Sequence, residues 1–81
     1  MKTIISLLPN QEGRQILSEI KNGDYGDFKF TYHSDSTCIN IVFDGNFSID
    51  YKEPYMWIED QRYCYFRIPT RLINRFYVIG D

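Results

Sequence analysis

Alternation of aromatic or branched residues with polar ones is the feature that most constrains the fold of this 81-residue chain. In residues 27–33 every second residue is aromatic, which is the two-residue period of a strand with one buried face. The same period returns in 37–43 and in 47–51, where isoleucine and aromatic residues alternate with polar ones. These segments predict three antiparallel strands that share one apolar face.

Matching the apolar faces of these segments predicts how the strands pair. A three-residue loop over 44–46 pairs Phe43 with Phe47 and leaves a left-handed position suited to glycine. The same matching pairs Tyr32 with Ile39 in the preceding hairpin. The three strands then form a meander whose apolar face is available to a helix.

One short helix is predicted before these strands. Asn10 is a good N-cap, and apolar residues recur at helical spacing until Asn22 and Gly23 end the segment, which gives a helix of about 11 residues. Gly13 lies on the apolar side of this helix, where the missing Cβ allows a close approach to the sheet. The helix is therefore expected to pack against the sheet and to carry no functional residues.

A second hairpin is predicted over 55–58 and 62–68, around turn residues 59–61, and both of its faces are apolar. One face has Met56, Ile58, Cys64, Phe66 and Ile68; the other has Tyr55, Trp57, Tyr63 and Tyr65. A strand that is apolar on both faces is either covered twice or presents a contact surface. With one clear helix available as cover, a contact surface is the favoured interpretation, and a second small core is the alternative.

The segment after Pro69 has two interpretations. Thr70 is placed to cap a short helix that gathers the apolar residues of 70–76 on one face, whereas 77–79 has the composition of a final strand. The overall prediction is a single α+β domain over 1–81. It has an N-terminal helix packed on a small antiparallel sheet of about five strands, with the short C-terminal helix left open.

The net charge of −2 conceals a division along the chain. Residues 22–60 hold eight acids against two lysines, a local balance of −6, whereas 61–80 hold four arginines and no acid. The first part supplies a candidate acidic patch of Asp44, Asp50, Glu53, Glu59 and Asp60. The second part supplies the candidate partner-binding arginines Arg62, Arg67, Arg71 and Arg75.

Catalytic and metal-binding patterns are weak in this chain. His33 lies near Asp35, but no serine or cysteine is marked as an activated nucleophile, so the histidine is interpreted as an exposed residue at a strand end. Asp50 and Lys52 have the spacing of an acidic-x-Lys metal-dependent nuclease, a spacing that is common by chance. The sequence predicts no enzyme activity, no cofactor and no metal.

The cysteines and the first residues indicate the compartment. Cys38 and Cys64 lack the spacing of zinc ligands and are interpreted as buried free thiols, with a disulfide between them as the alternative. The apolar residues of 1–8 are cut short by Pro9 before they reach the length of a signal-peptide core. No apolar run approaches the roughly 20 residues that a membrane helix needs, so we expect a cytoplasmic protein without membrane contact.

The aromatic and arginine residues of 55–77 carry the functional prediction, because tyrosine, tryptophan and arginine concentrate binding energy at protein interfaces. The first hypothesis is a small non-enzymatic regulator or inhibitor of a larger protein, which binds through this hairpin face or through the acidic patch. The alanine-free composition suggests a phage or mobile-element gene. A single-stranded nucleic-acid-binding module is the second hypothesis and a metal-dependent hydrolase around Asp50 the third. Homo-oligomer formation is left open.

Overall fold

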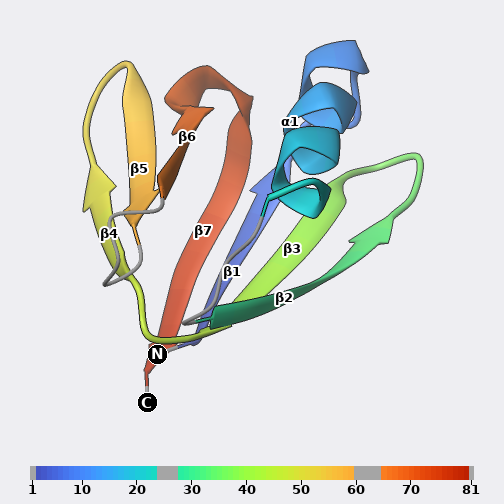
Figure 1. Cartoon of the computed structure of the whole chain (residues 1–81). Coiled ribbons are helices and arrows are strands. Elements are labelled where there is room, and N and C mark those ends of the chain that lie inside the picture. The colour runs from blue at the N-terminus through green and yellow to red at the C-terminus, as the bar shows by residue number, and fades with distance from the viewer. Residues whose placement is uncertain (1, 24–27, 60–64, 81) are drawn as a thin grey trace.

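The computed structural model describes residues 2–23, 28–59 and 65–80 (Figure 1). Within these ranges the chain forms one α-helix, one 3-10 turn and seven strands. In chain order they are β1 Lys2–Leu7, α1 Gln11–Lys21, β2 Phe28–Ser34, β3 Ile39–Gly45, β4 Ser48–Tyr51, β5 Tyr55–Glu59, β6 Tyr65–Pro69, η1 Thr70–Leu72 and β7 Ile73–Gly80. The fold is α+β, as predicted, but antiparallel sheet dominates it.

The strands form two sheets rather than the predicted single sheet of about five strands. Sheet A has the order β2-β3-β1-β7 and sheet B the order β4-β5-β6, with antiparallel neighbours throughout. Helix α1 and sheet B pack on the same face of sheet A, as Figure 1 shows, and the core lies between them. Its buried residues are Ile5, Leu7, Leu17, Ile20, Ile39, Ile41, Phe43, Phe47, Met56, Ile58 and Ile68.

Strand β1 was not predicted, and it occupies the middle of sheet A. It pairs with β3 on one side and with β7 on the other, so the helix follows a strand and is not the first element. Ile5 and Leu7 are fully buried on the core face, and Ser6 on the opposite face is only 3% exposed. On that opposite face Lys2 is exposed and Ile4 half-buried, and the adjacent Ile4 and Ile5 interrupt the polar and apolar alternation that marks the other strands.

The predicted hairpin over 44–46 is wrong. Strand β3 pairs with β2 and β1, so Phe43 lies opposite Thr3, and β4 pairs with β5 in the other sheet. Phe43 and Phe47 still meet, with ring centroids 6.1 Å apart, but they do so across the core. The chain leaves β3 through Gly45, whose positive φ of 132° is a conformation that glycine adopts without strain.

The hairpin of β2 and β3 forms in a register two residues away from the predicted one. Tyr32 pairs with Ile41 instead of Ile39, and a shift of two keeps every side chain on its predicted face. Residues 35–38 form the turn between the two strands, which is closed by a hydrogen bond from the Asp35 N–H to the Cys38 carbonyl, 3.1 Å long.

The second hairpin is confirmed by the pairing of β5 with β6, but its predicted turn over 59–61 is wrong, because Ile58 lies opposite Phe66 and Glu59 opposite Tyr65. Strand β5 continues through Glu59, and the remainder of the predicted turn, with Cys64, falls in 60–64, outside the described residues. After Pro69 the predicted short C-terminal helix is reduced to the single 3-10 turn η1, and the strand alternative is correct. An extended β7 satisfies the second edge of β1, which a helix would leave unpaired.

Helix α1 has the predicted limits and cap. The Asn10 side chain accepts a hydrogen bond from the Gly13 N–H at 2.8 Å, and Leu17 and Ile20 are buried. A Cβ at Gly13 would lie 2.0 Å from the Leu8 carbonyl oxygen. The close approach that the glycine permits is therefore to the connection that leaves β1, not to the sheet itself.

Replacing Thr3 with valine is expected to stabilise the fold. The Thr3 side chain is fully buried, and its hydroxyl has no hydrogen-bond partner among the described residues. Thr3→Val keeps the shape and removes an uncompensated polar group, which should raise the free energy of unfolding by about 1 kcal/mol in urea denaturation. Thr3→Ala is the control, since it also removes the hydroxyl but leaves a cavity. Equal destabilisation by both variants would contradict this prediction.

Candidate functional site

The outer face of sheet B, the side opposite the core, is formed by Ser48, Asp50, Tyr55, Trp57, Glu59 and Arg67. Side chains alternate along a strand, so the complete burial of Met56 and Ile58 directs their neighbours Tyr55 and Trp57 outward. Both aromatic rings are half-buried at this surface. Two of the predicted partner-binding residues therefore share one face.

Arg67 joins these two aromatic residues from the neighbouring strand. It lies opposite Trp57 in the pairing of β5 with β6. The centre of its guanidinium is 4.2 Å from the centroid of the Tyr55 ring and 5.9 Å from that of the Trp57 ring, while the two rings meet edge to face with centroids 6.5 Å apart. Each cation–π contact contributes about 0.5–1 kcal/mol at an exposed site, so the cluster is held in place before any partner arrives.

A groove of about 370 Å³ lies beside this cluster, over the paired strands β4 and β5. It is lined by Ser48, Asp50, Lys52, Trp57 and Glu59. The Lys52 ammonium is 3.3 Å from a carboxylate oxygen of Asp50, and both side chains are exposed. Glu59 forms no ion pair with a described residue. The groove thus combines the Trp57 indole with two carboxylates and one ammonium group.

The remaining predicted arginines and tyrosines are distributed elsewhere. Arg71, in η1, forms an ion pair with Glu12 at the start of α1, and its hydrogen bond lowers the pKa of Glu12. Arg75 lies on the face of sheet A opposite the core and donates a hydrogen bond to the Tyr77 hydroxyl at 3.0 Å. For Tyr65 only the backbone position in β6 is described, and Arg62 and Tyr63 lie outside the described residues.

The predicted acidic patch is divided in the same way. Asp50 and Glu59 line the groove, whereas Glu53 accepts a hydrogen bond from the Thr70 hydroxyl near η1. Asp44 belongs to β3 and lies opposite lysines of both neighbouring strands of sheet A. Asp60 lies outside the described residues. Cross-strand register, rather than closeness in sequence, decides which carboxylates share a surface.

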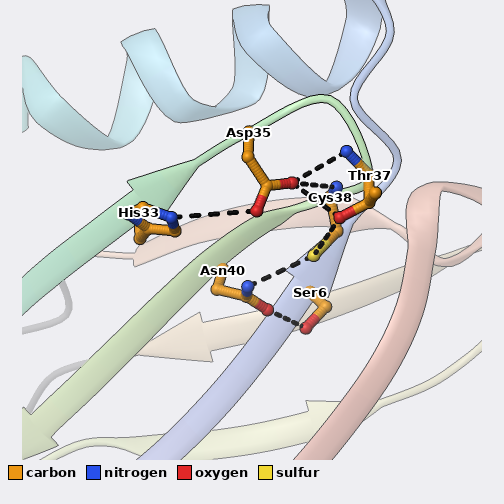
Figure 2. A network of polar contacts seen from close by, with 6 residues as sticks. All are labelled: Ser6, His33, Asp35, Thr37, Cys38 and Asn40. Atoms are coloured by element: carbon orange, nitrogen blue, oxygen red, sulfur yellow. Dashed lines mark hydrogen bonds and ion pairs between the residues drawn. The ribbon is translucent and has the colours of Figure 1, made fainter.

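Asp35 has a structural role in the hairpin of β2 and β3 (Figure 2). One of its carboxylate oxygens accepts hydrogen bonds from the Thr37 N–H at 2.7 Å, the Thr37 hydroxyl at 2.6 Å and the Cys38 N–H at 3.1 Å. The His33 imidazole is 3.7 Å from the other oxygen, at an exposed position. Because so many donors stabilise the charged form, the pKa of Asp35 is lowered to about 2.

Cys38 is a free thiol, as the first interpretation predicts, but it is partly buried and precedes β3 instead of lying inside a strand. Its sulfur accepts a hydrogen bond from the Asn40 amide at 3.2 Å, and the Asn40 carbonyl oxygen accepts one from the Ser6 hydroxyl (Figure 2). Within the described ranges, no three histidine, cysteine or acidic side chains are grouped so that they can hold a metal ion. No helix there is long and apolar enough to span a membrane.

The stability contribution of the Asp35 charge should depend on pH in a defined window. A folded-state pKa of about 2, below the ordinary 3.8, means that the ionised group stabilises the fold above 3.8, and that this contribution is lost as the pH falls towards 2. Asp35→Asn should therefore lower the free energy of unfolding at neutral pH, with a difference from wild type that shrinks over this window. An NMR titration of the Asp35 carboxyl carbon gives the direct check, and a midpoint near 3.8 would contradict the assignment.

No protein-family model, curated protein or solved structure matches the chain. The chemistry of the described surfaces is therefore the basis for a proposal about function.

Proposed function

We propose that this domain is a non-enzymatic protein-binding module, a small regulator or inhibitor that contacts a larger protein through the outer face of sheet B. The observation that carries the proposal is the cluster of Tyr55, Trp57 and Arg67, which is ordered by its own contacts on the side of the sheet opposite the core. Tryptophan, tyrosine and arginine are the residue types most enriched among the residues that dominate binding energy.

Preorganisation is the physical reason why such a cluster suits binding. Ordering a long side chain at an interface costs roughly 0.5–1.5 kcal/mol. Arg67 already lies against two rings in the free domain, so less of its freedom remains to be lost. The half-buried rings still have apolar area that a partner can cover. The free thiol of Cys38 supports a reducing compartment such as the cytoplasm, and the alanine-free composition supports a phage or mobile-element origin.

The distribution of charge favours a protein partner over single-stranded nucleic acid. Phosphate binding requires several cations along one surface. Arg71 is paired with Glu12, Arg75 lies on sheet A, and the cluster around Arg67 borders the carboxylates of the groove. A nucleic-acid backbone would therefore meet negative charge beside the aromatic rings.

Truncating Trp57 is expected to weaken partner binding without unfolding the domain. The partner is first captured from a host lysate with the wild-type chain, and its affinity is then measured by calorimetry. Trp57→Ala and Arg67→Ala should each lower that affinity by about 10- to 100-fold, as for central interface residues. Thermal unfolding verifies that both variants remain folded.

Tyr77→Ala provides a matched control, because Tyr77 also lies beneath an arginine, with Arg75 5.9 Å from its ring centroid, but on sheet A. This variant should keep wild-type affinity. Loss of binding in Tyr77→Ala together with full binding in Trp57→Ala would contradict the proposal, because the contact surface would then lie on sheet A. Retention of single-stranded oligonucleotides that weakens with added salt would favour the nucleic-acid hypothesis instead.

A further inference from the structure

The last strand of sheet A carries exposed apolar side chains on both of its faces. We propose that β7 pairs in antiparallel orientation with β7 of a second copy of the chain, about a two-fold axis at Tyr77, so that two four-stranded sheets join into one. This inference does not rest on the proposed function, because the contact lies at the edge of sheet A and its test measures the oligomeric state.

Strand β7 is an edge strand of sheet A. It pairs with β1 on one side, and no described strand pairs with the other side. An edge strand presents a row of backbone N–H and carbonyl groups that another extended segment can bind. Extra residues at Asn74 and Ile79 interrupt the pairing with β1, and 75–78 lie between them as a regular run. The outer side of this run is therefore suited to strand addition.

Three consecutive apolar side chains are exposed at the end of β7. Tyr77, Val78 and Ile79 are 45%, 51% and 56% exposed, and together they make up half of the large apolar residues that are exposed in the described part of the chain. Tyr77 lies opposite Ile4 and Val78 opposite the buried Thr3, so the two side chains lie on opposite faces of the sheet. A layer packed on one face would leave the other exposed, whereas a strand added at the edge covers part of both.

The three other edge strands have features that oppose strand addition. Strand β2 exposes Lys29, β4 is four residues long and contains Asp50, and β6 ends in Pro69, which has no backbone N–H. Charged side chains, short length and proline are the usual protection of an edge. Residues 76–79 of β7 include neither a charge nor a proline. Among these edges, β7 is the one best suited to pairing.

The pattern of side chains favours another copy of β7 as the added strand. An incoming strand must present apolar side chains on both faces, and β7 itself has this pattern. With Tyr77 opposite Tyr77 of the second copy, Val78 lies opposite Phe76 of the second copy. Arg75, the only charged residue of β7, then lies across from Ile79 of the second copy, so the two guanidinium groups do not face each other. Because both copies use the same surface, the pairing closes as a dimer.

Sedimentation velocity of the full chain measures the oligomeric state. A single strand contact covers less than the roughly 1,200–2,000 Å² of stable interfaces, so the wild-type chain should change from monomer to dimer as its concentration rises from about 10 μM to about 1 mM. A monomer throughout this range would overturn the proposal. Growth beyond a dimer would also overturn it, because larger species require two different edges.

Tyr77→Lys and Tyr77→Glu test the two-fold register, because each variant places two like charges directly opposite each other. Each variant alone should raise the dimer dissociation constant by about 10- to 100-fold. An equimolar mixture of the two should restore a dimer that contains one copy of each, since opposite charges then meet. Unchanged dimerisation of either variant, or no recovery in the mixture, would refute the pairing.

Tyr32→Lys is the matched control on the other edge of sheet A. Tyr32 is 46% exposed against 45% for Tyr77, and each ring lies beside a cation, Lys21 at 4.9 Å and Arg75 at 5.9 Å from the ring centroid. Tyr32→Lys should dimerise like the wild-type chain, and its dissociation would assign the contact to β2 instead. Thermal unfolding verifies that the variants remain folded.

Amide hydrogen exchange on the wild-type chain gives a check that needs no variant. The backbone N–H groups of β7 that point away from β1 should exchange more slowly as the protein concentration rises, because they become hydrogen-bonded to the second copy. The outward N–H groups of β2 should keep the same exchange rates. Protection that appears at β2, or exchange at β7 that does not depend on concentration, would contradict the proposed dimer.

Discussion

The pairing of β1 with both β3 and β7 is the interaction on which the other parts of the domain depend. It joins the first strand to the middle and the last strand of the chain, and a hydrogen bond from the Leu8 N–H to the Leu72 carbonyl, 2.9 Å long, extends the contact beyond the sheet. This arrangement creates the continuous apolar face that α1 and sheet B cover. Such non-local pairing requires long loops to close, at a cost in chain entropy, before the stabilising contacts form. This order of events is characteristic of slow-folding β-rich domains.

The outer face of sheet B owes its chemistry to what the inner face buries. Met56, Ile58 and Ile68 are fully buried against sheet A, so the alternate positions of the same strands are left for Trp57 and Arg67. The Thr70 N–H donates to the Pro54 carbonyl at 2.9 Å and so extends the β5–β6 pairing beyond Tyr55 and Pro69. A core substitution that rotates this sheet would therefore alter the aromatic cluster without touching it.

Local signals in the sequence predict local structure well, and non-local pairing is where they fail. The cap at Asn10 and the two apolar sides of the β5–β6 hairpin can be identified from a few neighbouring residues. Strand β1 cannot, because Ser6 is buried as fully as its apolar neighbours and the alternation disappears. The groove was not predicted for a related reason. Asp50 and Glu59 come to the same face only through the pairing of β4 with β5, whereas the face pattern of β4 is equally compatible with β3.

The pairing of Lys2 with Gly80 places the two ends of the described chain side by side. A circular permutant that joins these ends by a short turn would convert the pairing most distant in sequence into a hairpin. The loop-closure entropy of that contact would then be small, and the chain could be reopened at an exposed turn such as the one after Ser34. The same arrangement of strands could therefore be formed by a chain that connects them in a different order.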